Sequence, residues 1–148
     1  VVMGMVTPAM SEDKPADTMG FVQEKVRADK KLFVAENMQL TDAEAKAFWP
    51  IYDRYQDEQF LLHARAEKLI KDFAAAYEQM TDDTARQLLD EFMTIEFMDL
   101  MIRQVFLPEF RKVLPESKVA RYYQSENKIK AVSSYELAAK IPLMKIKN

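Results

Sequence analysis

The chain contains no cysteine and a single histidine, His63. The lack of cysteine excludes disulfide bonds, thiolate zinc sites, a cysteine nucleophile and haem attached through a Cys-x-x-Cys-His motif. A single histidine also falls short of the Glu-x-x-His pairs and nitrogen-rich ligand sets of common di-iron and zinc centres. We therefore expect no cofactor. Absence of cysteine is compatible with an oxidising compartment without requiring one.

Glycine is nearly as scarce, since the only two are Gly4 and Gly20. Gly-rich phosphate loops, Rossmann turns and the Gly-x-Ser-x-Gly elbow of hydrolases cannot occur after position 20. β-Hairpins also favour turn positions with positive φ, which glycine supplies. The long stretch without glycine predicts an all-α protein whose helices are joined by short turns, and nothing in it indicates an enzyme.

No long run of one charge and no long apolar run is present. The net charge of −3 does not favour nucleic-acid binding, which rests on many phosphate contacts. No stretch of 18 apolar residues predicts a transmembrane segment. The 148 residues are 49% hydrophobic and 30% charged, a balance typical of one globular domain.

The N-terminal residues carry a signal of their own. An apolar stretch over 1–6 passes into small and polar residues, as at the end of a signal peptide. We interpret residues 1–18 as a signal-peptide remnant and linker, which predicts export; an unstructured apolar tail is the alternative. Residues 19–142 are expected to form a single helical domain, and 143–148 a frayed tail.

Apolar periodicity and start signals predict about four helices. The first is expected over about 19–37, and the second runs from a capping box at Thr41 to about 79. The third is expected over 82–113, and the fourth begins at 115 and ends before Pro142. The second and third exceed 30 residues and each contains a proline, which should bend them. We therefore expect an elongated bundle in which two long bent helices form a hairpin.

Residues 92–107 do not fit a surface helix with one apolar stripe. Phe97, Leu100 and Met101 lie on one side of the helix, and Met93 is placed with them as an adaptable methionine. On a second side lie Ile95, Met98, Ile102, Val105 and Phe106, and a narrow charged sector holds Glu96, Asp99 and Arg103. Three interpretations remain open: a central helix of the bundle, a dimer interface, and an exposed binding surface.

Two other groups of residues are weaker candidates. His63 and Glu67 can share a helix face as metal ligands, with Glu96 or Asp99 added from another helix, but His63 as an ordinary surface residue is favoured. Asp99 and Arg103 at i,i+4 indicate a surface ion pair. The aromatic residues around Trp49 and Tyr122 form either core or a binding cluster, and their helical spacing favours core.

The segment Leu40-Thr41-Asp42-Ala43-Glu44 resembles the Leu-Thr-x-x-Gln motif of the Spy/CpxP family of bacterial periplasmic proteins. Leu40 and Thr41 match, and Glu44 stands in place of the glutamine. The second copy of the family motif would fall at 114–118, where only Leu114 agrees. The resemblance covers the organisation of about residues 20–140.

This resemblance implies a small exported protein with long bent helices that forms a cradle-shaped homodimer in the periplasm. It implies three activities: ATP-independent chaperoning of an unfolded client on a concave apolar and basic surface, modulation of an envelope-stress sensor, and metal-linked sensing. The chain largely lacks the metal-ligand residues of the last group. The alternative is a structural helical module whose apolar faces are consumed by folding and dimerisation. We expect a protein partner or client.

Overall fold

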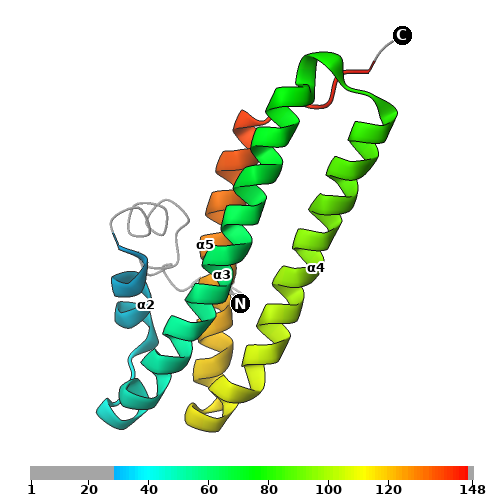
Figure 1. The fold of residues 1–148 in the computed structure, drawn as a ribbon. Helices are drawn as coiled ribbons and strands as arrows, with labels where there is room; N and C mark the ends of the chain where they lie inside the picture. Colours follow the sequence, from blue (N-terminus) through cyan, green and yellow to red (C-terminus); the bar gives the residue numbers. More distant parts are fainter. Residues whose placement is uncertain (1–28, 147–148) are drawn as a thin grey trace, which may run out of the picture.

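The computed structural model describes residues 29–146, which form a helical bundle without strands over that range. The helices are α2 (Lys30–Met38), α3 (Asp42–Ala76), the 3₁₀ turn η2 (Tyr77–Gln79), α4 (Asp82–Val113) and α5 (Glu116–Lys140). α3 and α4 form a long antiparallel hairpin, and short α2 lies beside the end of the hairpin that is opposite the η2 turn (Figure 1). α5 packs along α3 through side-chain contacts such as Gln56 with Glu126 and Phe48 with Tyr122. The predicted all-α fold with two long packed helices is confirmed.

The start of α3 has the predicted capping box. The Glu44 backbone N–H donates to the Thr41 hydroxyl oxygen at 3.2 Å, and the Thr41 N–H donates to the Glu44 carboxylate at 3.1 Å. These bonds satisfy two backbone donors that a helix start leaves without partners. α4 begins with a simpler cap, in which the Thr84 N–H donates to the Thr81 hydroxyl oxygen at 3.2 Å.

Most predicted boundaries agree with the structure, and two differ. α3 ends at Ala76 and continues as the η2 turn instead of reaching 79 as α-helix. α2 starts at Lys30, so the helix expected over about 19–37 is interrupted at Asp29, whose backbone is extended and whose carboxylate caps α2 by accepting from the Leu32 N–H. The predicted residues 19–28 of that helix and the signal-peptide segment 1–18 lie outside the described residues. α3 and α4 continue through Pro50 and Pro108.

The core is an aromatic cluster at one end of the bundle. Phe48 of α3, Phe110 of α4 and Tyr122 of α5 are at most 1% exposed. Their ring centroids lie 5.5 Å (Phe48–Phe110), 5.1 Å (Phe48–Tyr122) and 4.9 Å (Phe110–Tyr122) apart. Such contacts favour close packing of large apolar surfaces, so one residue from each long helix fixes the three helices together.

The other end of the hairpin has almost no core. Of residues 63–94, all of which the structure describes, only Met80 is buried. The large apolar residues Leu69 and Phe73 of α3 are only half-buried. The hairpin therefore extends beyond the packed region as an arm.

Removing the cap of α3 tests this account of the fold. Thr41→Ala should lower the free energy of unfolding by about 1 kcal/mol, because a backbone N–H of α3 loses its acceptor. Urea unfolding followed by the fluorescence of Trp49, the only tryptophan, measures this change. Thr94→Ala is the matched control, since the Thr94 hydroxyl donates only to the Asp90 carbonyl within α4. An equal loss in both variants would contradict the capping role.

Candidate binding surface on the helical hairpin

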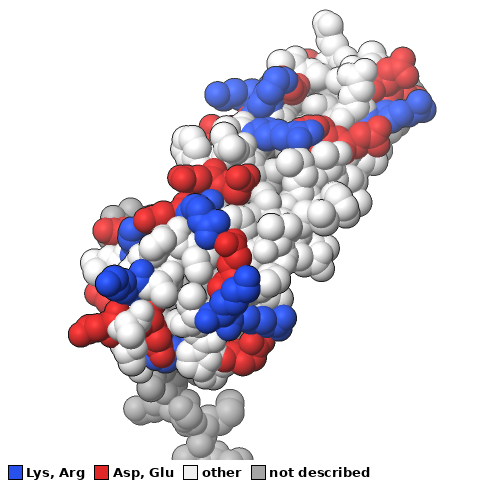
Figure 2. All heavy atoms as spheres, turned by 60° about the horizontal axis from the view of Figure 1, so that its bottom comes forward, with Lys and Arg blue, Asp and Glu red and all other residues white. Residues whose placement is uncertain are grey.

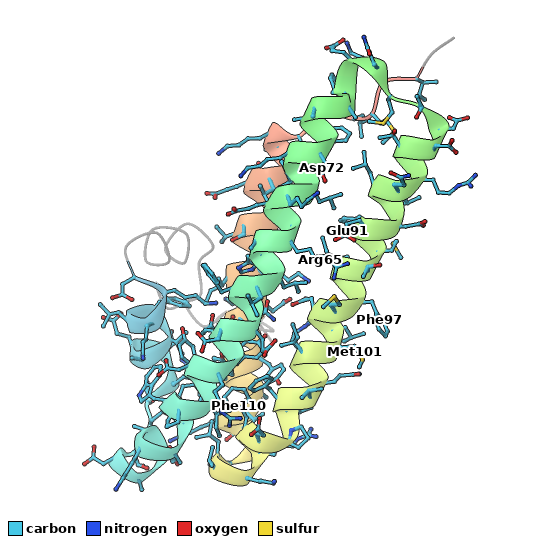
Figure 3. All side chains as sticks on the ribbon, in the orientation of Figure 1. Arg65, Asp72, Glu91, Phe97, Met101 and Phe110 are labelled. Carbon is cyan, nitrogen blue, oxygen red and sulfur yellow. The ribbon has the colours of Figure 1, made fainter. Side chains whose placement is uncertain are left out.

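The side of α4 that points away from α3 carries large apolar side chains exposed to solvent. Phe97 is 61% exposed, Met93 59% and Met101 43%, and they follow one another at intervals of four residues. Figure 3 shows Phe97 and Met101 on the side of α4 opposite to α3. We define the outer face of α4 as the exposed residues Leu89, Met93, Phe97, Leu100, Met101 and Val105.

The packing of the inner side of α4 explains why residues 92–107 have apolar side chains on two sides of the helix. Ile95 and Phe106 are buried, and Ile102 packs half-buried against the core. Val105, which the sequence places with them, is 60% exposed and belongs to the outer face instead. One part of the arc thus packs against the bundle, whereas the four predicted surface residues Met93, Phe97, Leu100 and Met101 remain exposed in the single chain.

The outer face of α4 is exposed because only α3 and α5 pack against this helix among the described elements. α4 packs mainly on α3 and touches α5 less, and no described element covers its far side (Figure 1). Figure 2 shows an area without charged atoms toward the right of the view, where α4 lies, with charged groups toward both ends of the molecule. A contiguous exposed apolar patch of this kind marks an interaction site more often than it marks an ordinary surface.

A polar cluster lies between α3, α4 and α5, next to the outer face but pointing inward. Asp99 is its centre, at 8% exposure. Its carboxylate accepts from Gln59 at 3.1 Å and from Lys130 at 2.7 Å, and pairs with Arg103 at 3.2 Å. The predicted pair of Asp99 with Arg103 exists, but its placement on the surface was wrong, because α5 covers it and contributes Lys130.

Opposing effects set the pKa of the Asp99 carboxyl. Burial raises its pKa, but hydrogen bonds from Lys130 and Gln59 and the charges of Lys130 and Arg103 outweigh burial, so the pKa lies below its ordinary value. The neighbouring Tyr123 hydroxyl donates to the Arg103 carbonyl at 2.6 Å, and burial raises its pKa to about 12. Both groups therefore keep one protonation state near neutral pH, which suits a structural role.

Three of the four candidate metal ligands line the same cavity. His63, Glu96 and Asp99 line one cavity of about 200 Å³ between α3, α4 and α5, whereas Glu67 does not line it. Within residues 29–146 no group of three histidine or acidic side chains has a geometry suited to a metal ion. Partial burial and the charge of Lys30 lower the pKa of His63. A cavity of mixed charge whose central carboxylate is already paired does not indicate a catalytic site.

The two segments of the suspected family motif meet at the end of the bundle near the core. Leu114 is buried and Leu40 packs half-buried against the core. Lys118, at the position of the second copy, donates to the Glu44 carboxylate at 2.6 Å and to the Gln39 carbonyl at 3.0 Å. The hydrogen bond from Lys118, together with that from the Thr41 N–H, lowers the pKa of Glu44. These residues serve helix packing.

The other predicted candidates also have structural partners. Trp49 and Tyr122 belong to the aromatic core or pack against it, as their spacing predicts. Lys30 pairs with Glu126 at 3.1 Å and Lys31 with Asp53 at 2.9 Å, so these lysines of the first helix do not form a free basic patch.

Neither comparison with known proteins nor the hydropathy of the helices indicates a function. Comparisons of the chain with protein-family models, with curated proteins and with solved structures give no match. No helix in the described range has the length and apolarity needed to cross a bilayer.

The polar cluster predicts a stability effect at Asp99. Asp99→Asn should lower the free energy of unfolding by about 2 kcal/mol, because Lys130 and Arg103 lose their charged partner in a region shielded from water. Glu96→Gln is the matched control, since Lys130 lies 3.9 Å from this half-exposed carboxylate. Because folding lowers the pKa of Asp99, its contribution is present above about pH 4 and is lost as the pH falls toward the folded-state value. Equal losses in both variants would contradict this assignment.

His63 predicts a separate pH effect. Its folded-state pKa lies below the usual value of about 6.5, so the unfolded chain binds the proton first as the pH falls. Its contribution therefore destabilises the fold progressively below about pH 6.5. Urea unfolding between about pH 5 and 8 should show a shallower pH dependence for His63→Gln than for the wild-type chain. Superimposable profiles would contradict the lowered pKa.

Proposed function

We propose that this chain is a non-enzymatic binding protein that holds apolar segments of another protein on the outer face of α4. One observation carries the proposal: Leu89, Met93, Phe97, Met101 and Val105 form an exposed row, one side chain in each turn of the helix. Leaving such a row in water is unfavourable, and binding an apolar partner removes it from solvent.

The composition of the row suits varied partners. Met93 and Met101 flank Phe97, and unbranched methionine side chains adapt to differently shaped surfaces. The aromatic ring supplies a large contact at the centre of the row. This combination favours a chaperone-like protein or a stress adaptor over a rigid structural module, although a second copy of the chain is also a protein that can occupy the row.

The N-terminal apolar segment and the suspected Spy/CpxP resemblance support a periplasmic place for this activity. Export, membership of that family and a role in envelope stress are parts of the same proposal. One feature differs from the basic surface that the resemblance implies: the exposed row on α4 has Asp90 and Glu96 beside it.

An aggregation assay with matched variants tests the proposal. A thermally unfolding enzyme is heated with stoichiometric amounts of the chain, and light scattering reports its aggregation. Phe97→Asp should abolish most of the protection, because it places a charge in the middle of the row. Phe60→Asp is the control, since Phe60 is 72% exposed on α3 and lies outside the outer face. Both variants should fold normally, since exposed substitutions change stability by roughly 0.5 kcal/mol or less.

Three outcomes would count against the proposal. The first is that the wild-type chain fails to protect the enzyme, and the second is that the two variants lose protection equally. The third is that sedimentation shows a stable dimer, which Phe97→Asp converts to monomer without loss of protection. The last result would assign the row to self-association.

A further inference from the structure

We propose that the outer face of α4 selects a partner segment that is both apolar and positively charged, namely a basic amphipathic helix of another protein. This inference rests on the proposed function and specifies its ligand. It follows from the charges beside the apolar row and from the spacing of the row along α4.

The charges on this side of α4 are mainly negative. At 3.6 residues per turn, four carboxylates and two basic groups lie beside, between or just beyond the apolar residues. The carboxylates are Asp82, Asp83, Asp90 and Glu96, and the basic residues are Arg86 and Lys112. The bases Arg103 and Arg111 are engaged, the first with Asp99 and the second with Glu116 at 2.8 Å. A partner therefore meets a surplus of negative charge.

Three of these four carboxylates have no ion pair among the described residues, and the fourth has a long one. Across residues 29–146, Asp82, Asp83 and Asp90 form no ion pair, whereas Glu96 pairs with Lys130 at 3.9 Å, and the same lysine lies closer to Asp99, at 2.7 Å. By contrast, Glu91 on the side of α4 facing α3 is paired with Arg65, and Figure 3 shows the two side chains bridging the helices. Unpaired charges around an apolar patch attract a partner of opposite sign and repel one of like sign.

The spacing of the row fits a helical partner. Leu89, Met93, Phe97, Met101 and Val105 form an i, i+4 ridge, the kind of ridge that packs into the groove of a second helix. The ridge extends over 16 residue steps, about 24 Å at 1.5 Å per residue. A helix of roughly 18 residues covers this length, with its apolar stripe on the ridge and its basic residues beside the carboxylates.

Two dye-labelled peptides of about 18 residues test the inference. They share one apolar stripe of leucine and phenylalanine, and their flanking positions carry lysine in one peptide and glutamate in the other. Fluorescence anisotropy with the full chain should give on the order of tenfold tighter binding of the lysine peptide at low salt. The difference should shrink at high salt, because ions screen exposed charges.

Variants separate the charge from the apolar row. Asp90→Lys should reduce the preference for the lysine peptide several-fold, whereas the control Asp57→Lys, a charge reversal at an exposed site on α3, should leave it unchanged. Phe97→Asp should weaken binding of both peptides, because the apolar contact is shared. Circular dichroism establishes that each variant is folded.

The outcomes distinguish this inference from the proposed function. Equal binding of the two peptides, lost in Phe97→Asp, overturns the charge preference and leaves the apolar binding surface intact. Absence of binding by either peptide, together with absence of protection in the aggregation assay, overturns both. A dimer that neither peptide dissociates assigns the outer face to a second copy and overturns the basic helix as its occupant.

Discussion

The packing of Phe48, Phe110 and Tyr122 is the contact on which the rest of the structure depends. Each ring comes from a different long helix, and all three are buried at the same end of the bundle. Because one end is fixed in this way, α3 and α4 can extend beyond it with little packing of their own. The capping box at Thr41 and the ion pair between Lys118 and Glu44 reinforce the same end.

The exposed row on α4 is a consequence of this asymmetry. A domain of this size ordinarily surrounds its central helices with others, but here the apolar residues over 89–105 exceed what α3 and α5 can cover. The polar cluster at Asp99 lies on the inner side of the same stretch of helix, and its bonds to Gln59 and Lys130 hold α4 in one rotation about its axis. That rotation keeps Phe97 directed outward. The interior thus fixes which residues the surface presents.

The sequence predicted those parts of the fold that depend on local signals. The capping box at Thr41 and the helix starts expected at 82 and 115 agree with the structure to within one residue. The helical spacing of the aromatic residues around Trp49 and Tyr122 correctly favoured core. A continuous helix over about 19–37 was wrong because Asp29 was not recognised as the cap of α2.

The candidate site was only partly predictable, because its character depends on contacts between helices. Met93, Phe97, Leu100 and Met101 could be grouped from the sequence of 92–107, whereas Val105 was placed on the wrong side and Leu89 lies outside that segment. The exposure of these residues could not be predicted, since it depends on how many helices pack around α4. Burial of Asp99 depends on Lys130, 31 residues further along the chain, and no local pattern indicates that pairing.

Methionine methyl groups offer the most direct test of the central claim, that the outer face of α4 is where the chain binds its partner. Met93 and Met101 lie on that face, whereas Met38 is 1% exposed in the core. NMR spectra of methyl-labelled methionine, recorded while an unfolded client is added, should show the Met93 and Met101 signals shifting or broadening and the Met38 signal unchanged. Unperturbed Met93 and Met101 signals in the presence of bound client would contradict the account.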